Sequence, residues 1–202
     1  MLRVGLTGGM GSGKTTVASI FASFGIPTYN ADEAAKQLMN DNAAIRTAII
    51  DKFGNESYIG KELNRLHLSK IVFSDPEKLN WLNTLIHPIT ISDAQRWMDQ
   101  QKSPYLIKEA ALLFESGASK DLDLIIGVTA PEKLRIARVL ERDQTDISQI
   151  KKRIELQLEE SLKMKLCDFV INNDEVTPLL AQVLQIDKEI RKRAMQVKPS
   201  QF

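Results

Sequence analysis

The sequence predicts an α/β protein built on a five-stranded parallel sheet, because three observations agree. Short apolar or β-branched segments alternate with segments whose apolar residues recur at helical spacing. A glycine-rich stretch, residues 8–15, follows the first short segment and precedes a helical pattern. The segment 123–129 is apolar without alternation, as expected for a strand covered on both faces.

The glycine-rich stretch, residues 8–15, fits the pattern G-x-x-x-x-G-K-[ST] of a phosphate-binding P-loop. Its glycines let backbone N–H groups converge on an anion. Lys14 can bridge the β- and γ-phosphates of a nucleotide, and the hydroxyl of Thr15 suits the shell of Mg²⁺. We therefore expect the phosphates of a nucleotide to be bound by Gly11, Ser12, Gly13, Lys14, Thr15 and Thr16.

The first helix, expected over 14–24, leads to a second strand over 26–29. Asp32 follows it, where a new helical pattern begins. The carboxyl ends of parallel strands meet at the edge where the phosphate loop opens. Asp32 is then either a first-turn acid that stabilises its helix or a carboxylate directed at the nucleotide site, and its position favours the second interpretation.

Residues 40–102 are helical in pattern throughout, without a convincing strand. Asp75-Pro76 opens one helix with proline in its first turn. His87-Pro88 marks a bend in the next helix or its boundary, and a lone histidine beside proline is more often structural than catalytic. Such an insertion is where a P-loop kinase would hold its acceptor.

The alternation resumes with strands at 105–109, 123–129 and 168–172, then a helix over 176–193 and a tail expected to fray from Gln196. Glu109 falls near the carboxyl end of its strand. It could hold Mg²⁺ through water or be a charged residue at an exposed strand end, and the sequence leaves both interpretations open.

A helix that begins after Pro131 carries Arg135, Arg138 and Arg142 at i, i+3 and i+7 on one face. Three arginines on one side of a helix slightly favour anion binding. The alternative is a solvated face whose arginines pair with the neighbouring acids Glu132, Glu141 and Asp143.

The composition limits the functional classes to which the protein can belong. Lys+Arg 27 against Asp+Glu 26 leaves a net charge of +1, so no global field attracts nucleic acid or an anionic membrane. Cys167 is the single cysteine, which excludes an internal disulfide, and the chain shows no signal-like start or long apolar run. We expect a cytoplasmic monomer or small homo-oligomer without nucleic-acid or membrane partners.

Several separated stretches together resemble the dephospho-coenzyme A kinase family. Residues 5–18 resemble the family's opening, and Asn30-Ala31-Asp32 its Asp-Ala-Asp. The more specific matches are Leu82–Pro88, which fits Leu-Asn-x-Leu-x-His-Pro, and Leu112–Glu115, which fits Leu-Leu-Phe-Glu. Further matches over residues 142–173 are Arg142-Asp143, Arg153-Ile154-x-x-Gln157 and Asp168-x-Val170-Ile171-x-Asn173.

The resemblance implies transfer of a phosphoryl group from ATP to the ribose 3′-hydroxyl of dephospho-coenzyme A, with Mg²⁺ at Thr15. It implies that Asp32 is the catalytic carboxylate, and that Lys14 and Arg138 stabilise charge on the transferring group. Arg142 is expected to contact ATP, and the expected acceptor contacts are Asp32, His87, Glu109 and Leu113. Asn30 replaces the family's first Asp, and Arg135 stands where a neutral residue is usual, so its loss is expected to matter little.

The implied organisation is one domain, 1–202, with a nucleotide-binding core (1–29, 103–134 and 166–195), a helical acceptor-binding lobe (30–102) and a lid (135–165). Two alternatives remain. Another small P-loop kinase, acting on a nucleoside monophosphate or a small alcohol, would share the loop and the lid. A GTP-binding switch is suggested by Asp51-Lys52-Phe53-Gly54, which spells D-x-x-G, but this match lies in a helical stretch and no Asn-Lys-x-Asp motif occurs.

Overall fold

A computed structural model describes residues 1–143 and 146–196, so the fraying expected from Gln196 onwards falls almost entirely outside the described residues. The chain divides into two compact units, residues 1–30 with 100–202 and residues 31–99. Each is described by itself. In the described part of the chain, no helix combines the length and the apolar character needed to cross a bilayer.

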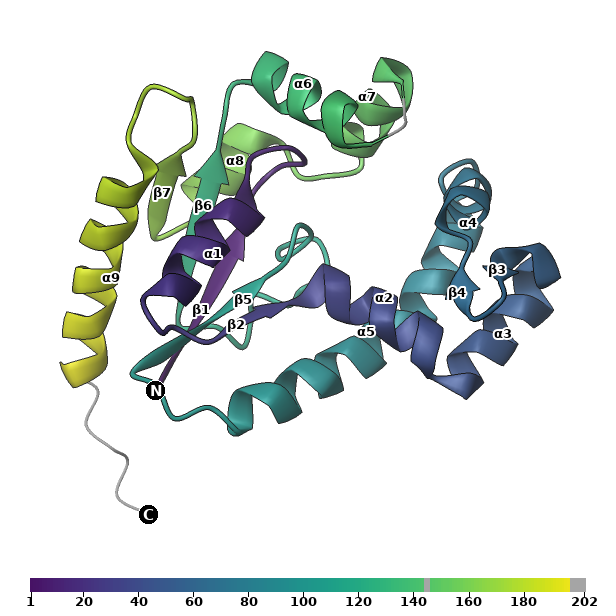
Figure 1. Cartoon of the computed structure of the whole chain (residues 1–202), viewed down its shortest axis with the longest axis horizontal. Coiled ribbons are helices and arrows are strands. Elements are labelled where there is room, and N and C mark those ends of the chain that lie inside the picture. Colours follow the sequence, from purple (N-terminus) through teal and green to yellow (C-terminus); the bar gives the residue numbers. More distant parts are fainter. Residues whose placement is uncertain (144–145, 197–202) are drawn as a thin grey trace. The chain divides into compact units, whose positions relative to one another are not determined.

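The first unit contains the predicted five-stranded parallel sheet (Figure 1). The strand order is β2-β5-β1-β6-β7, and every neighbouring pair is parallel. The strands are β1 (Leu2–Thr7), β2 (Thr28–Asn30), β5 (Tyr105–Glu109), β6 (Leu124–Thr129) and β7 (Phe169–Asn172). Both neighbours of the central strand β1 therefore come from the later part of the chain. The predicted fold class is confirmed.

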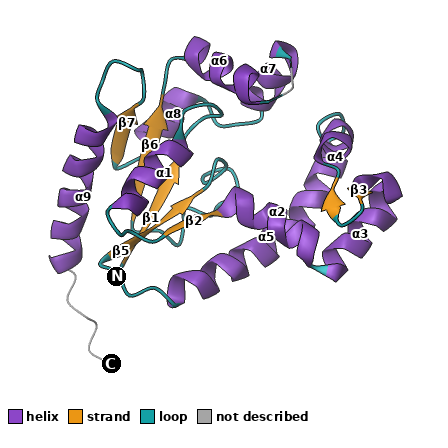
Figure 2. Cartoon of the chain, in the orientation of Figure 1, coloured by secondary structure: helices purple, strands orange, loops and turns teal. Residues whose placement is uncertain are grey.

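One face of this sheet packs against α1 (Lys14–Ser23) and α9 (Leu179–Gln196), which lie alongside the strands in Figure 2. The core that they share consists of aliphatic side chains with two aromatic rings, Phe21 and Tyr105, stacked edge to face. The buried Tyr105 hydroxyl donates a hydrogen bond of 2.6 Å to Asp187 on α9. Burial and this neighbouring carboxylate raise the pKa of Tyr105, so the phenol stays protonated and holds α9 on the sheet.

The other face is covered closely, which explains glycines inside two strands. A Cβ at Gly5 would meet the side chain of Leu113, and one at Gly127 would meet Met164 and Cys167. These last two belong to α8 (Glu160–Lys165) and the segment after it. The preceding helices of this region are α6 (Glu132–Arg142) and α7 (Ile147–Glu155).

Partial burial also lowers the reactivity of Cys167. It raises the pKa of the thiol to about 11, and only the thiolate attacks alkylating agents. At pH 8 we expect iodoacetamide to modify the folded protein roughly 100-fold more slowly than the chain unfolded in urea. Mass spectrometry of timed samples measures both rates, and equal rates would contradict the assignment.

The second unit is mostly helical and has its own apolar core. Its helices are α2 (Ala31–Asp41), α3 (Ala43–Phe53), the short η1 (Asn55–Ser57), α4 (Arg65–Val72) and α5 (Pro76–Asp99). The buried residues of this core are Ile45, Ile49, Phe53, Tyr58, Leu68, Val72 and Ile86. The D-x-x-G match lies at the end of α3, which confirms that it is helical there.

The prediction of helix throughout this insertion is wrong at one place, a small antiparallel hairpin. Strands β3 (Tyr58–Ile59) and β4 (Glu62–Leu63) pair across a turn in which Gly60 has a φ of 62°. Arg46 fixes the turn because its guanidinium donates to the carbonyl oxygen of Gly60 at 2.6 Å. Two-residue strands are too short to show alternation in a sequence.

Helix α5 excludes one of the two predictions for His87-Pro88. Asp75 caps its start, accepting from the N–H of Glu77 at 3.0 Å, and Pro76 occupies the first turn as expected. The helix then continues through Pro88 to Asp99, so His87-Pro88 is not a helix boundary. His87 is half-buried on this helix.

Candidate active site

The glycine-rich stretch forms a tight loop between β1 and the start of α1. Gly11 and Gly13 adopt φ of 78° and 89°, a left-handed conformation that glycine tolerates best. Gly13 caps α1, whose first turn carries no acidic side chain. The positive end of the helix dipole therefore faces the loop without a competing carboxylate in that turn, as an anion site requires.

Neighbouring segments pack so closely on the loop that its glycines have no room for a side chain. A Cβ at Gly9 would lie 2.1 Å from the guanidinium of Arg135, and one at Gly13 2.1 Å from the amide nitrogen of Asn173. Asn173 also donates a buried hydrogen bond of 2.8 Å to the carbonyl oxygen of Ser12. The loop is therefore shaped by α6 and by the residue after β7 as well as by its own sequence.

The side chains expected to meet phosphate and metal gather at the carboxyl ends of β1, β2 and β5. Lys14 extends back over the loop, where its ammonium donates to the carbonyl oxygen of Gly8 at 3.1 Å. The hydroxyl of Thr15 donates to Glu109 at 2.7 Å, and the amide of Asn30 donates to the same carboxylate at 3.1 Å. Glu109 is therefore a buried acid beside the loop, not a residue at an exposed strand end.

The three arginines of α6 have different surroundings. The guanidinium of Arg138 donates to the carbonyl oxygen of Asn173 at 3.2 Å and pairs with Glu175 at 3.2 Å. Arg142 pairs with Asp143, and its side chain is 66% exposed. Only this third arginine uses a partner that the solvated-face interpretation named.

Arg135 corrects the prediction of a single arginine face. The residue is 4% exposed, its backbone lies against Gly11, and its guanidinium pairs with Glu160 of α8 at 3.4 Å. The sequence could not show this, because the covering helix α8 lies about two dozen residues further along the chain. The mild effect expected for its loss conflicts with this burial, since removal would leave Glu160 without its partner.

The prediction that Leu113 contacts the acceptor is also corrected. Its side chain is fully buried against Gly5, so Leu113 packs in the interior and is not an acceptor contact. Of the other expected acceptor contacts, Glu109 belongs to the first unit, and Asp32 and His87 belong to the second. Asp32 is exposed in the first turn of α2, directly after β2 in the sequence.

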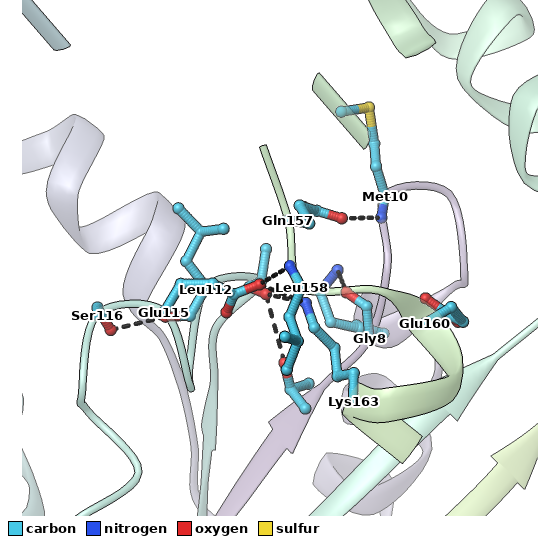
Figure 3. Close-up of polar contacts among 12 residues, drawn as sticks. Gly8, Met10, Leu112, Glu115, Ser116, Gln157, Leu158, Glu160 and Lys163 are labelled. Atoms are coloured by element: carbon cyan, nitrogen blue, oxygen red, sulfur yellow. Dashed lines mark hydrogen bonds and ion pairs between the residues drawn. The ribbon is translucent and has the colours of Figure 1, made fainter. Parts of the chain in front are cut away.

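Figure 3 shows a set of polar residues around the loop that the sequence did not single out as site residues. Gln157, Glu115 and Lys163 are joined to the loop or to one another by hydrogen bonds. Gln157 and Glu115 lie in stretches that carry the family resemblance. The resemblance indicated that these stretches matter but assigned neither residue a role. Lys163 is prominent in a charged helical stretch, but the sequence assigned it no role.

A central phosphate loop followed by a helix, on a parallel sheet whose neighbouring strand supplies an acid to the loop threonine, defines the P-loop phosphotransferases. The dephospho-CoA kinase family model matches residues 2–178. The chain is 39% identical over 186 residues to the dephospho-CoA kinase of Coxiella burnetii, covering 91% of this chain and 94% of that one. It is 39% identical over 180 residues to that of Salinibacter ruber, covering 86% and 89%. The chain belongs to the dephospho-CoA kinase family.

Solved structures agree. The dephospho-CoA kinase from Campylobacter jejuni superposes with a TM-score of 0.68 at 26% identity, covering 95% of this chain and 98% of that one. TT1252 from Thermus thermophilus gives a TM-score of 0.81 at 28% identity, covering 93% and 96%. A shikimate kinase from Acinetobacter baumannii, at 12% identity and a TM-score of 0.54 with 96% and 94% covered, shares the fold alone.

Proposed function

We propose that this chain transfers the γ-phosphoryl group of ATP to the ribose 3′-hydroxyl of dephospho-coenzyme A, which yields coenzyme A and ADP. The observation that carries the proposal is the phosphate loop with its Thr15–Glu109 contact, in a chain that matches dephospho-CoA kinases over residues 2–178. The comparisons do not favour the alternative of a kinase for nucleoside monophosphates or small alcohols.

Phosphoryl transfer needs positioning and charge stabilisation more than covalent chemistry from the protein. The backbone of residues 11–16 would hold the ATP phosphates at the start of α1. Lys14 would exchange the carbonyl oxygen of Gly8 for phosphate oxygens. Arg138 would place its planar guanidinium on the transferring group, and Arg142, exposed at the end of α6, would contact the nucleotide from the same helix.

The residues around Thr15 fit Mg²⁺. A hydroxyl and a carboxylate oxygen lie 2.7 Å apart beside the loop, and Mg²⁺ prefers oxygen ligands while keeping several waters. Thr15 would hold the ion directly and Glu109 through water, and the bound ion would neutralise charge on the β- and γ-phosphates. The contact with Thr15 favours this role for Glu109 over the acceptor contact expected from the resemblance.

Asp32 would orient the 3′-hydroxyl of the acceptor and accept its proton, and His87 would help to hold the acceptor. Residues 31–99 would then form the acceptor-binding lobe. Residues 135–165 would act as a lid that excludes water before transfer. We place this enzyme in the cytoplasm, as a monomer or small homo-oligomer.

The direct test is a coupled assay for ADP production with ATP and dephospho-coenzyme A as substrates. Turnover should require both substrates, and NMR spectroscopy of the product can locate the new phosphate on the 3′-oxygen. Parallel reactions with nucleoside monophosphates and with shikimate examine the alternative. Turnover with one of these, and none with dephospho-coenzyme A, would contradict the proposal.

Asp32→Asn should lower kcat by roughly 10²- to 10⁴-fold with ATP affinity nearly unchanged, because the variant loses a general base and no phosphate contact. Asp41→Asn is the matched control, since Asp41 is an exposed acid at the other end of α2. Steady-state kinetics and an ATP titration measure the two quantities. If ATP binding weakens while kcat stays normal, Asp32 serves the metal or the helix instead.

A further inference from the structure

The first half of the phosphate loop is held by the segment that joins α7 to α8. The side-chain oxygen of Gln157 accepts a hydrogen bond of 3.1 Å from the N–H of Met10, as Figure 3 shows. Within the loop, the N–H of Ser12 donates to the carbonyl oxygen of Gly9 at 3.1 Å. These two contacts fix the turn from Gly9 to Ser12, which leads directly into the residues expected to bind phosphate.

The segment that carries Gln157 is itself anchored by an ion pair in which the lysine is buried and the glutamate reaches the surface. Glu115 accepts from the N–H of Leu158 at 2.8 Å and from the ammonium of Lys163 at 2.9 Å (Figure 3). The Lys163 side chain is 0% exposed, and its ammonium also donates to the carbonyl oxygen of Ala111 at 3.1 Å. Although burial raises the pKa of Glu115, these donors together bring it below its ordinary value, so the acid is charged at neutral pH.

These contacts form one path from the end of β5 to the phosphate loop. Ala111 and Glu115 lie in the turn that follows β5, the strand whose Glu109 contacts Thr15. Lys163 and Leu158 connect this turn to the segment before α8, and Gln157 connects that segment to Met10. A second contact between α8 and the loop runs through Glu160 and Arg135, whose guanidinium lies against Gly9.

We propose that Gln157 is a positioning residue for the phosphates of the bound nucleotide, and that the Glu115–Lys163 pair holds it in place. The proposal rests on the proposed function in that the nucleotide is ATP bound at this loop. The side-chain oxygen of Gln157 accepts from the loop backbone, so we assign Gln157 an effect on the nucleotide that is exerted through the loop. Its loss should therefore change nucleotide affinity and leave acceptor affinity unchanged.

Gln157→Met keeps the length of the side chain and removes the strong acceptor. We expect the Kd for ADP and the KM for ATP to rise about tenfold, the upper end of the effect of losing one hydrogen bond, while the KM for dephospho-coenzyme A stays unchanged. The melting temperature should fall little. Calorimetric titration of ADP needs no acceptor, so this result remains readable even if dephospho-coenzyme A proves not to be the substrate.

Gln182→Met is the control for a merely structural effect. Gln182 of α9 also bonds a backbone N–H, that of Asn172, at 2.9 Å, and it donates to the carbonyl oxygen of the same residue at 2.9 Å. Its loss should lower the melting temperature at least as much as Gln157→Met while the Kd for ADP stays at the wild-type value. Equal Kd values for the two variants would overturn the proposal.

The role of the ion pair is tested by Glu115→Gln, a milder change than removing the buried Lys163. The amide can still accept from Leu158 but no longer neutralises the ammonium, so we expect the Kd for ADP to rise in the same direction. If the pair acts through Gln157, the double variant should bind ADP no more weakly than Gln157→Met alone. Multiplied effects in the double variant, or a lower melting temperature with unchanged Kd, would contradict this.

Discussion

Lys14→Ala should abolish detectable turnover with dephospho-coenzyme A while the protein stays folded. The ammonium of Lys14 contacts the Gly8 carbonyl at the surface of the loop and contributes nothing to the apolar core of the first unit. In the reaction it would be a fixed positive charge beside the β- and γ-phosphates, and charge stabilisation is most of what this chemistry requires. The coupled assay and a thermal melt measure the two effects.

Lys192→Ala provides the matched comparison, because Lys192 is an exposed lysine on α9. It should melt and turn over like the wild type. Near-normal turnover of Lys14→Ala at an unchanged melting temperature would show that the lysine is not part of the reaction. A large drop in melting temperature would instead show that it supports the fold.

Arg138→Ala is expected to lower kcat by roughly 10³-fold or more, by analogy with arginines that meet charge developing on a transferring phosphoryl group. Arg138 contacts Asn173, whose amide in turn donates to the loop at Ser12, so it already lies one residue from the phosphate site. Arg138→Lys should restore little, since lysine keeps the charge but lacks the planar fork that binds two oxygens.

Arg193→Ala is the suitable control, because Arg193 pairs with Glu189 on the same helix and its side chain is 41% exposed. Surface pairs of this kind contribute about 0–1 kcal/mol to the free energy of unfolding. The variant should therefore stay folded, and its kcat should not change. Arg135 cannot serve as the control, since it is buried against the loop. Mild, equal effects at Arg138 and Arg193 would make Arg138 an ordinary surface residue.

The sheet and the loop could be predicted from the sequence because their signals are local. The phosphate loop is a single short stretch whose residue types are each required by backbone geometry or by charge. The continuous apolar run at β6 is typical of a strand buried on both faces. The β3–β4 hairpin could not be predicted because it has no comparable local signal. Its strands have two residues each and depend on Arg46, which lies on α3.

The place of a residue in the site could be predicted where it depends on the residue's position along a strand. It could not be predicted where it depends on packing between segments that are distant in the sequence. Glu109 was expected at the loop edge because it ends β5. Arg135 and Leu113 were misjudged because helical spacing and a family motif do not reveal what covers a side chain. Lys163 gave no signal, since an exposed lysine and a fully buried one look alike in a helical, charged stretch.

The strand order also sets the sequence of events during synthesis. Strand β1, which carries the phosphate loop, has as its neighbours only β5 and β6, and Leu2 pairs with Tyr105. On the ribosome, the loop therefore emerges early but finds neither flanking strand until β5 (Tyr105–Glu109) has been made. Closing so long a loop is entropically unfavourable, although the cost grows only with the logarithm of its length. The part of the nucleotide site made first is among the last to be supported, so nascent chains that end before β5 should be unable to retain ATP.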